Sequence, residues 1–424
     1  MRIVTEELNW AGNYRYRAEA IQCPVTVEEL QELVAGAAHV RALGSRHSFN
    51  DIADSAGILI TLENMDPAIA VDATAGSVAV NGGTKYGTLA EELQRQGFAL
   101  HNLASLPHIS VAGAIATATH GSGDRNGNLS TPVSAMEIVT ASGELLTVSR
   151  DSSSDFAGMV VGLGAMGVVS RVTLDIEPTF TVRQNVFENL LWTQVLANFD
   201  EVTSSAYSVS LFTNWRGDTV DSAWLKSRND DGSAPVEARS EFFGGTPASE
   251  ARHPVPGISA VNSTQQLGVP GSWDDRLAHF RMAFTPSSGE ELQTEYLVPR
   301  EHAVEAIEAM RGLSDQISPL LQVSEIRTVA ADDLWLSPNY KRAGIGLHLT
   351  WKPEQEAVEK LLPLIECKLV PFAARPHWGK LFNAEAAALA PLYEKFPDFQ
   401  ALAERLDPAR KFRNDFLARK IFGV

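Results

Sequence analysis

The sequence has very few cysteines and no long apolar run. Only Cys23 and Cys367 occur among its 424 residues. Two are too few for a disulfide framework or a cysteine-ligated zinc site, and they fit a reducing compartment. No apolar run approaches the ~18 residues that cross a bilayer, so we expect no membrane span. The opening stretch, MRIVTEELNWAGNYRYR, lacks a basic region followed by an apolar run, which predicts a cytoplasmic protein without a secretory signal.

Positive charge is also scarce. Lys and Arg total 35 against 52 Asp and Glu, which gives a net charge of −17. A chain this acidic repels nucleic acid and anionic lipid unless its basic residues gather on one face, and no basic run indicates such a face. Hydrophobic residues at 44% and charged residues at 21% are typical of a globular protein. We therefore expect a monomeric enzyme that acts on a small molecule, with no nucleic-acid, membrane or metal partner.

Helices and short strands alternate over roughly the first hundred residues. Thr26-x-x-Glu29 has the form of a capping box, in which side chains satisfy free N–H groups at a helix start. Thr88-x-x-Glu91 predicts the start of a second helix that runs to about Gly97. Apolar runs predict strands at 39–43, 58–62 and 78–80. This alternation favours a mixed α/β domain.

The pattern changes from about residue 182 onward. Alternating segments predict a second sheet, with strands at 207–211, 223–225, 325–329 and 346–351. Polar, glycine-rich or proline-rich stretches predict long loops at 227–235 and 252–270. Pro299 predicts a helix start, and another helical stretch follows Glu354. The fold class that we expect is α+β in two domains.

One glycine motif suggests a nucleotide site but lacks its structural context. Gly162-Leu-Gly164-Ala-Met-Gly167 matches G-x-G-x-x-G, the dinucleotide-binding fingerprint. That site needs a helix opening at the glycines, whose N-terminus receives the pyrophosphate. Residues 168–176 instead alternate β-branched residues like a strand. We interpret the motif as a glycine-rich bend before a strand.

Two tracts of small residues are better candidates for a cofactor site. A predicted strand runs into Gly44-Ser45, where backbone N–H groups can turn toward an anion, and His47 follows in the same loop. Residues 110–123 consist mostly of Ala, Gly, Ser and Thr, which let the backbone approach a flat ligand. Taken alone, the first tract is also compatible with a surface turn and the second with a tight helix-on-sheet contact. Together they favour an extended dinucleotide.

These residues carry a resemblance to a known family. GSRHSFND, ASLPHISVAGAIATATHGSG and LGAMGVV together resemble the FAD domain of the vanillyl-alcohol-oxidase flavoproteins. NWRGDT, SEIRTVAAD, GLHLTW and PFAARPHWGK resemble the bacterial alditol oxidase subgroup, so the likeness spans essentially the whole chain. Arg46 departs from the pattern, since many relatives are expected to have glycine there.

The resemblance implies FAD as the cofactor, bonded covalently through His47 to the 8α-methyl carbon of the flavin. A neutral imidazole nitrogen is a competent nucleophile near neutral pH. Residues 44–48 would cradle the pyrophosphate. The remaining residues that the resemblance assigns to FAD binding are Gly44, Ser45, Arg46, Ser48, Ser105, Ser110, Gly113, Thr117, Ala118, Thr119, His120, Val169 and His377.

The substrate side is predicted to lie on two strands of the second sheet. Glu325 and Arg327 are two residues apart and share a face, as do His348 and Thr350. Four polar groups on two sheet faces suit a polyol, whose hydroxyls each need a donor and an acceptor. An exposed strand pair with one Glu–Arg ion pair is the simpler alternative. A lone lysine is usually solvated, and the resemblance alone places Lys380 at the active site, beside Ser105 and His348.

The resemblance also implies a domain division and an activity. Residues 1–178 would form the FAD-binding domain, 179–368 the substrate domain, and 369–424 a segment closing on the FAD domain. The expected activity is oxidation of the C1 hydroxyl of an alditol such as xylitol or sorbitol, with reduction of O2 to H2O2. His348 and Lys380 would contact the reacting hydroxyl; Ser105, Glu325, Arg327 and Thr350 would bind the substrate. The alternatives are an aldonolactone oxidase or dehydrogenase of the same family, and a non-catalytic carbohydrate-binding protein.

Overall fold

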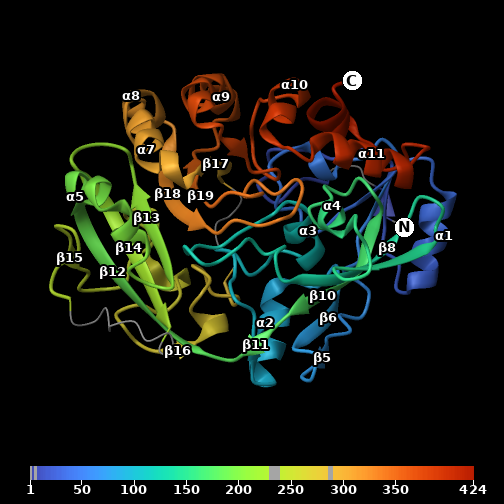
Figure 1. The fold of residues 1–424 in the computed structure, drawn as a ribbon, viewed down its shortest axis with the longest axis horizontal. Helices are drawn as coiled ribbons and strands as arrows, with labels where there is room; N and C mark the ends of the chain where they lie inside the picture. Colours follow the sequence, from blue (N-terminus) through green and yellow to red (C-terminus); the bar gives the residue numbers. More distant parts are fainter. Residues whose placement is uncertain (1, 4–6, 229–238, 285–289) are drawn as a thin grey trace.

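The computed structural model describes residues 2–3, 7–228, 239–284 and 290–424. Strands from the middle of the chain form one large sheet on the left of Figure 1, and the N-terminal third lies on the right. The C-terminal helices lie along the top of the view, beside the N-terminal strands. Separate sheets surrounded by helices confirm the α+β expectation. Among the described residues, no helix has both the length and the apolar character needed to span a bilayer.

The N-terminal part of the chain, up to residue 178, contains two main sheets. The first has the order β1 (Arg2–Ile3), β2 (Ala20–Gln22), β4 (Ile58–Ile60), β3 (Val40–Ala42). The second is antiparallel, in the order β5 (Ala70–Asp72), β6 (Ser77–Asn81), β10 (Val168–Asp175), β8 (Val133–Val139), β9 (Leu145–Ser149). A small ribbon pairs β7 (Phe98–Ala99) with β11 (Glu177–Pro178). The three strands predicted in this region are confirmed as β3, β4 and β6. The helices here are α1 (Val27–Gly36), α2 (Tyr86–Arg95), α3 (Val111–Ala116) and α4 (Phe156–Val160).

The two predicted helix starts have different outcomes. Thr26 caps α1, since its side chain accepts a hydrogen bond from the backbone N–H of Glu29, as expected. The prediction for α2 is wrong, because that helix begins at Tyr86 and Thr88 lies inside it. No side chain caps α2. Its first N–H groups instead donate to carbonyls of the 107–109 segment, so a tertiary contact sets this start.

The middle of the chain forms a nine-stranded sheet. Its order is β15 (Thr246–Pro247), β12 (Thr181–Leu191), β14 (Thr219–Arg228), β13 (Ser208–Thr213), β18 (Leu321–Val329), β19 (Gly344–Trp351), β17 (Leu292–Pro299), β20 (Arg375–Pro376), with β16 (Gly271–Ser272) beside β12. The four strands predicted for this region are confirmed as parts of β13, β14, β18 and β19, although the predicted range 207–211 begins one residue before β13. The remaining helices are α5 (Trp192–Ala197), α6 (Phe199–Thr203), α7 (Ala303–Arg311), α8 (Ser314–Ile317), α9 (Gln355–Leu369), α10 (Ala386–Leu389), α11 (Phe396–Leu406) and α12 (Asp415–Leu417).

The predicted loops and helix starts in this region are partly confirmed. Residues 252–270 are irregular apart from one 3₁₀ turn, Ala260–Asn262. The loop predicted at 227–235 begins too early, because β14 extends to Arg228, and residues 229–235 lie outside the described residues. After Pro299 the chain makes a 3₁₀ turn, Arg300–His302, before α7 begins.

The glycine motif forms a bend, as interpreted from the sequence. It leads directly into strand β10 rather than into a helix. Gly167 has φ +146°, and a Cβ there would lie 2.5 Å from the carbonyl oxygen of Val139. Glycine is therefore required by close packing against β8 and not by a phosphate at a helix N-terminus.

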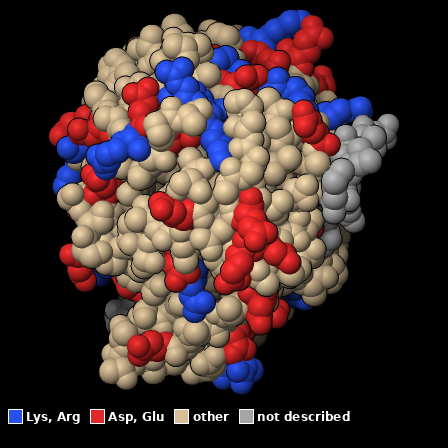
Figure 2. All heavy atoms as spheres, turned by 90° about the vertical axis from the view of Figure 1, so that its right-hand side faces the viewer, with Lys and Arg blue, Asp and Glu red and all other residues tan. Residues whose placement is uncertain are grey.

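Charged side chains of both signs are mixed over one face of the molecule. Figure 2 shows lysine and arginine interspersed with acidic residues there, with acidic groups gathered in a band right of the middle. This distribution accords with the net charge of −17.

Arg41 joins the C-terminal segment to the N-terminal sheets. Its side chain lies on β3 and is 3% exposed. Nη1 donates to the carbonyl oxygens of Gly164, at 2.7 Å, and Phe412, at 3.0 Å. Nη2 donates to those of Leu163, at 2.8 Å, and Ile52. One buried cation thus satisfies four backbone carbonyls from three distant segments, which fixes the glycine bend and the chain end against β3.

Replacing Arg41 is expected to destabilise the fold. Arg41→Met leaves four carbonyls without this donor, and the free energy of unfolding should fall by about 3 kcal/mol. Urea unfolding followed by circular dichroism measures this change. The matched control is Arg125→Met at an exposed arginine, which should shift the free energy of unfolding by less than about 0.5 kcal/mol. Equal losses in the two variants would contradict the role assigned to Arg41.

Candidate active site

One cavity of about 480 Å³ brings the predicted site residues together. The 44–48 loop, the small-residue tract and the glycine bend form one wall, and the polar face of β17, β18 and β19 forms another. All six residues predicted for catalysis or substrate binding line it: Ser105, Glu325, Arg327, His348, Thr350 and Lys380.

Nearly all residues predicted to bind the cofactor also line this cavity. They are Gly44, Ser45, Arg46, His47, Ser48, Ser105, Ser110, Gly113, Thr117, Thr119, His120, Val169 and His377. Ala118 does not line it. This residue is 1% exposed and has φ +53°, so the chain turns there while Thr117 and Thr119 face the cavity.

The two small-residue tracts hold each other through serine side chains. The backbone N–H of Ser110 donates to Oγ of Ser45 at 3.0 Å, and the N–H of Ser45 donates to Oγ of Ser110 at 3.3 Å. A Cβ on Gly44 would lie 2.4 Å from Oγ of Ser110, so the approach requires glycine. The close contact confirms that the two tracts act as one surface.

Arg46 has the backbone conformation that favours glycine. Its φ is +64°, in the left-handed region that a non-glycine residue rarely adopts. Two contacts hold it there: its guanidinium pairs with Glu7, and its carbonyl accepts from the N–H of Trp10 at 2.8 Å. The loop thus keeps the conformation that glycine would allow, at the cost of the strain that an arginine introduces.

His47 presents a neutral imidazole with an unused nitrogen. Burial lowers its pKa to about 4, so the ring carries no charge at neutral pH. Its ring stacks on Trp10, with centroids 5.1 Å apart. Nδ1 is buried and has no hydrogen-bond partner among the described residues. A buried nitrogen without a partner, in a cavity wall built from small residues, fits a flat cofactor that binds against it.

The four polar strand residues share one face of one sheet. Glu325 on β18 lies directly opposite His348 on β19, while Arg327 and Thr350 follow two positions along their strands. The expectation of two sheet faces is therefore wrong, because β18 and β19 are adjacent and in register. The alternative of an exposed ion pair is also wrong, since these four side chains are 4–7% exposed.

Glu295 on β17 is the functional residue that the sequence analysis missed. It lies opposite His348 in the register of β17 and β19, and it is 1% exposed. Its Oε1 accepts from Nη2 of Arg327 at 2.8 Å and lies 3.2 Å from Nε2 of His120. Its Oε2 accepts from Nζ of Lys380 at 2.6 Å. The alternation of Glu291, Gln293 and Glu295 with other residues was a usable signal for a polar strand face.

Charges of opposite sign balance in this buried cluster. Burial alone would raise the pKa of Glu295, but Lys380 and Arg327 hold it well below its usual range. Burial opposes the ionisation of Glu325 too, and Arg327 and His279 together lower its pKa. Two carboxylates thus face two cations, so the cluster is close to neutral overall.

Lys380 and His348 form a hydrogen-bonded pair beside Glu295. Nζ of Lys380 lies 2.7 Å from Nδ1 of His348, and Nε2 of His348 lies 3.0 Å from Oγ1 of Thr350. Burial, followed by the charge of Lys380, lowers the pKa of His348 to about 4. Asn50 accounts for the placement of Lys380, since its side chain donates to the lysine carbonyl at 2.7 Å. The pair can therefore offer one cationic donor and one neutral proton acceptor to a hydroxyl.

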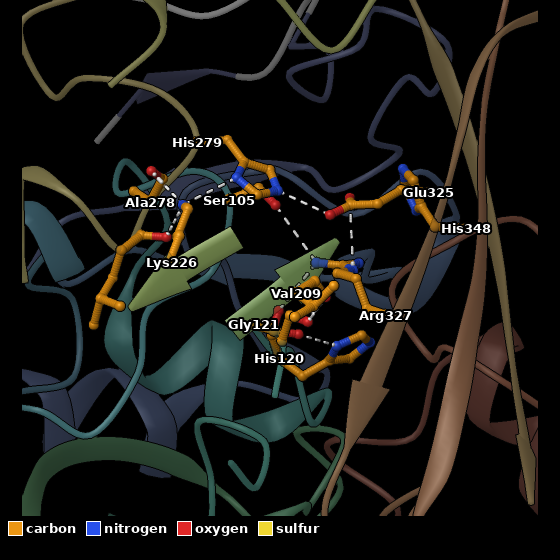
Figure 3. Close-up of polar contacts among 12 residues, drawn as sticks. Ser105, His120, Gly121, Val209, Lys226, Ala278, His279, Glu325, Arg327 and His348 are labelled. Carbon is orange, nitrogen blue, oxygen red and sulfur yellow. Dashed lines mark hydrogen bonds and ion pairs between the residues drawn. The ribbon is translucent and has the colours of Figure 1, made fainter. Parts of the chain in front are cut away.

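Ser105 and His120 connect the small-residue tract to the polar strands. Nη1 of Arg327 lies 3.4 Å from Oγ of Ser105 and 3.4 Å from the carbonyl oxygen of His120 (Figure 3). His377 lies near His120, with ring centroids 6.0 Å apart. Arg327 therefore joins the wall that would hold a cofactor to the wall that would hold a substrate, as Glu295 does through His120.

Two family models match the chain. The one described as "FAD binding domain" matches residues 18–149, and the one described as "D-arabinono-1,4-lactone oxidase" matches residues 273–420. Both matched regions contribute residues to the walls of the cavity. The cavity therefore lies between the segment that matches the FAD-binding model and the segment that matches the lactone-oxidase model.

Curated relatives cover the chain almost completely. An alditol oxidase of Streptomyces sp. (strain IKD472 / FERM P-14339) is 47% identical, covering 97% of this chain and 98% of its own length. An L-gulono-1,4-lactone dehydrogenase of Mycobacterium tuberculosis is 31% identical and covers 98% of each chain. The crystal structure of cholesterol oxidase from B. sterolicum, 16% identical, has a TM-score of 0.77 over 97% of this chain and 96% of that one. The last likeness shows a shared fold. The cavity, the FAD-domain match and the full-length similarity lead to one conclusion: the chain belongs to the vanillyl-alcohol-oxidase-type family of FAD-dependent oxidoreductases, which includes the alditol oxidases.

Proposed function

We propose that this protein is an alditol oxidase that converts the C1 hydroxyl of polyols such as xylitol and sorbitol to the aldehyde, reducing O2 to H2O2. The observation that carries the proposal is the buried polar face of Glu325, Arg327 and Thr350, which adjoins the Lys380–His348 pair in the same cavity as the 44–48 loop. A row of donors and acceptors suits a chain of hydroxyls better than an apolar substrate.

The residues around the small-residue tracts would hold FAD. Backbone N–H groups of the 44–48 loop other than that of Ser45 would receive its pyrophosphate, and the tract beginning at Ser110 would lie along it. When bound, FAD supplies an acceptor for the hydride from C1 and a route for two electrons to O2. His47 would bond covalently to the flavin, since this residue lines the cavity, its ring is neutral, and its Nδ1 has no hydrogen-bond partner among the described residues.

The Lys380–His348 pair would act on the reacting hydroxyl. The Lys380–His348 contact of 2.7 Å would open to admit the hydroxyl, which would accept from Nζ of Lys380 and donate to Nδ1 of His348. The cation stabilises the negative charge that develops on oxygen as the C–H bond breaks, and His348 takes the proton. Glu295 holds Lys380 in place through the 2.6 Å contact and compensates its charge.

The remaining polar residues would hold the hydroxyls farther along the substrate. Glu325 and Arg327 supply an acceptor and a donor on β18, and Thr350 supplies a hydroxyl on β19. Ser105 faces the same space from the cofactor side. Binding these hydroxyls orients the substrate so that C1 alone reaches the reacting position. A five- or six-carbon alditol fills this row, and glycerol leaves part of it unpaired.

We further propose a cytoplasmic monomer with the domain limits expected from the resemblance. The low cysteine content, two among 424 residues, supports the reducing compartment. The strands of the large sheet, from Thr181 to Pro376, come mainly from the proposed substrate domain, 179–368. β20 is the exception, since it belongs to the proposed closing segment, 369–424.

A second candidate function is oxidation of an aldonolactone. It is favoured by the lactone-oxidase family model over residues 273–420 and by the relative named L-gulono-1,4-lactone dehydrogenase. The two candidates differ at the reacting carbon, because a lactone has no free terminal CH2OH at the end where reaction occurs.

A substrate panel separates the two candidates. In air-saturated buffer without dye, xylitol and sorbitol should each yield aldose and H2O2 in equal amounts, with higher kcat/KM than glycerol. L-gulono-1,4-lactone should react far more slowly. Peroxide and product are measured together by coupled peroxidase and chromatography. Faster turnover of the lactone, or a strict need for an artificial acceptor, would favour the second candidate.

The covalent bond to FAD is tested by acid precipitation. The wild-type flavin should remain with the polypeptide, whereas His47→Ala should release it into the supernatant or give apoprotein, because the variant lacks the attacking nitrogen. In-gel fluorescence after denaturation gives a second readout. His108→Ala, at a half-buried histidine that does not line the cavity, serves as the control and should keep the bond. Retention of acid-stable flavin by His47→Ala would refute the attachment.

Lys380 is expected to be needed for turnover and not for flavin binding. Lys380→Met keeps much of the side-chain bulk and removes the donor to the reacting oxygen, so kcat for xylitol should fall ~10²–10³-fold. The flavin spectrum should stay close to that of the wild type. Lys360→Met, on the exposed face of α9, is the control and should leave kcat unchanged. Near-wild-type turnover by Lys380→Met would assign the activation to His348 alone.

A further inference from the structure

Lys226 is a buried lysine that the proposed reaction does not use. It lies on β14 and is 1% exposed. Its Nζ is 2.5 Å from the carbonyl oxygen of Leu277, 2.9 Å from that of Ala278 and 3.2 Å from Nδ1 of His279 (Figure 3). An ammonium has three N–H groups, so these three contacts match the charged form of the lysine.

His279 joins Lys226 to the polar face of the cavity. Its Nε2 lies 2.8 Å from Oε1 of Glu325. The ring packs edge-on against Phe212 and Trp224, at centroid distances of 5.7 Å and 5.4 Å, so it has no room to flip freely. Its backbone N–H donates to the carbonyl oxygen of Ser105 at 3.1 Å. The histidine is thus fixed between a cation and a substrate-facing carboxylate.

The two neighbours select one tautomer of His279. Burial lowers its pKa to about 4, so the ring is neutral and has a single N–H. When Lys226 donates to Nδ1, the proton lies on Nε2 and is donated to Glu325. The other tautomer would direct an N–H toward the ammonium and a lone pair toward the carboxylate. In a buried site with a low dielectric constant, that arrangement is strongly disfavoured.

The surroundings of Lys226 contain few other charges. His279 faces it directly, and Glu325 and Arg327 on β18 lie beyond the histidine. The neighbouring strands β12 and β13 present Gln184 and Ser208, which carry no charge. Burial lowers the pKa of Lys226 to about 7, so the ammonium form prevails at pH 6.

We propose that Lys226 and His279 are positioning residues that hold Glu325 ionised and aimed at a distal hydroxyl of the substrate. His279 occupies Oε1 of Glu325 through its Nε2–H. Oε2, which lies 3.6 Å from Nε of Arg327, is then free to accept from the substrate. The pair therefore acts on substrate binding and selectivity and not on the reacting carbon. This inference rests on the proposed alditol oxidation, because it assigns a role within that site.

The bonds of Lys226 to backbone carbonyls have a counterpart at a second buried lysine. Lys411 is a matched case, 9% exposed, whose Nζ donates to the carbonyl oxygens of Val34 at 2.7 Å and Ala35 at 3.0 Å. It does not line the cavity. Lys411→Met therefore reports the general effect of removing a buried lysine.

The first experiment compares these two variants as flavin-loaded enzymes. Lys226→Met should raise the KM for xylitol ~10-fold and leave kcat within about twofold, because one acceptor of a distal hydroxyl is misaligned. The KM for glycerol should change less than about threefold, since glycerol does not fill the row. Lys411→Met should leave both KM values unchanged. Equal effects on xylitol and glycerol, or a loss confined to kcat, would overturn the proposal.

Substitutions of His279 provide a conservative rescue. The amide of His279→Gln can accept from Lys226 and donate to Glu325, so the KM for xylitol should remain within about threefold of wild type. His279→Leu can neither accept from Lys226 nor donate to Glu325, so its KM for xylitol should rise as much as that of Lys226→Met. Adding Lys226→Met to His279→Leu should produce no further rise in the KM for xylitol, because His279→Leu has already removed the connection between Lys226 and Glu325. A further rise in KM as large as that caused by Lys226→Met alone would overturn the proposed connection through His279.

A measurement independent of turnover separates this inference from the proposed function. In enzyme labelled with ¹⁵N-histidine at pH 6, the His279 signal, assigned by its loss in His279→Gln, should show the proton on Nε2. In Lys226→Met that preference should weaken. A proton on Nδ1 of His279 in the wild type would refute the proposed connection from Lys226 to Glu325 even if xylitol is oxidised. Failure to oxidise any alditol would refute the proposed function, whatever the tautomer.

Discussion

The fully buried carboxylate of Glu295 sets the geometry of the rest of the site. A carboxylate in this position is stable only because Lys380, Arg327 and His120 surround it at 2.6–3.2 Å. Removing one partner of such a buried pair typically costs about 3–5 kcal/mol, since the other charge is left uncompensated. The need to satisfy Glu295 therefore determines where two of the proposed active-site cations lie.

The partners of Glu295 come from parts of the chain that are far apart in sequence. Arg327 lies on β18, Lys380 follows β20, and His120 lies within the small-residue tract at 110–123. One side chain thus links the large sheet to the proposed cofactor wall. Arg41 has a comparable role on the other side of that wall, where it holds the glycine bend and the chain end. Both sites use a buried charge that satisfies several partners at once.

Local signals located several helices and strands, and they failed where contacts between distant segments decide. Thr26 caps α1 as its sequence pattern predicts, and alternation located β18 and β19. The start of α2 was misplaced because its first N–H groups bond to the 107–109 segment, which no local pattern reveals. For the same reason the sequence located Glu325, Arg327, His348 and Thr350 on strands but assigned them to two faces. Only the pairing of β18 with β19 brings them onto one face.

The sequence by itself determined the fold class, the family and the two small-residue tracts. Periodicity and side-chain size are local properties, so they can be recognised from residues that are neighbours in the sequence. Through resemblance, the sequence also predicted that Lys380 and His47 are site residues, and both line the cavity. The tertiary structure alone decided the charge balance of the site. Glu295 is one acidic residue among 52 Asp and Glu, and no local feature distinguishes it until β17 pairs with β19. Burial and charge compensation depend on which strands become neighbours, and that is a property of the folded chain.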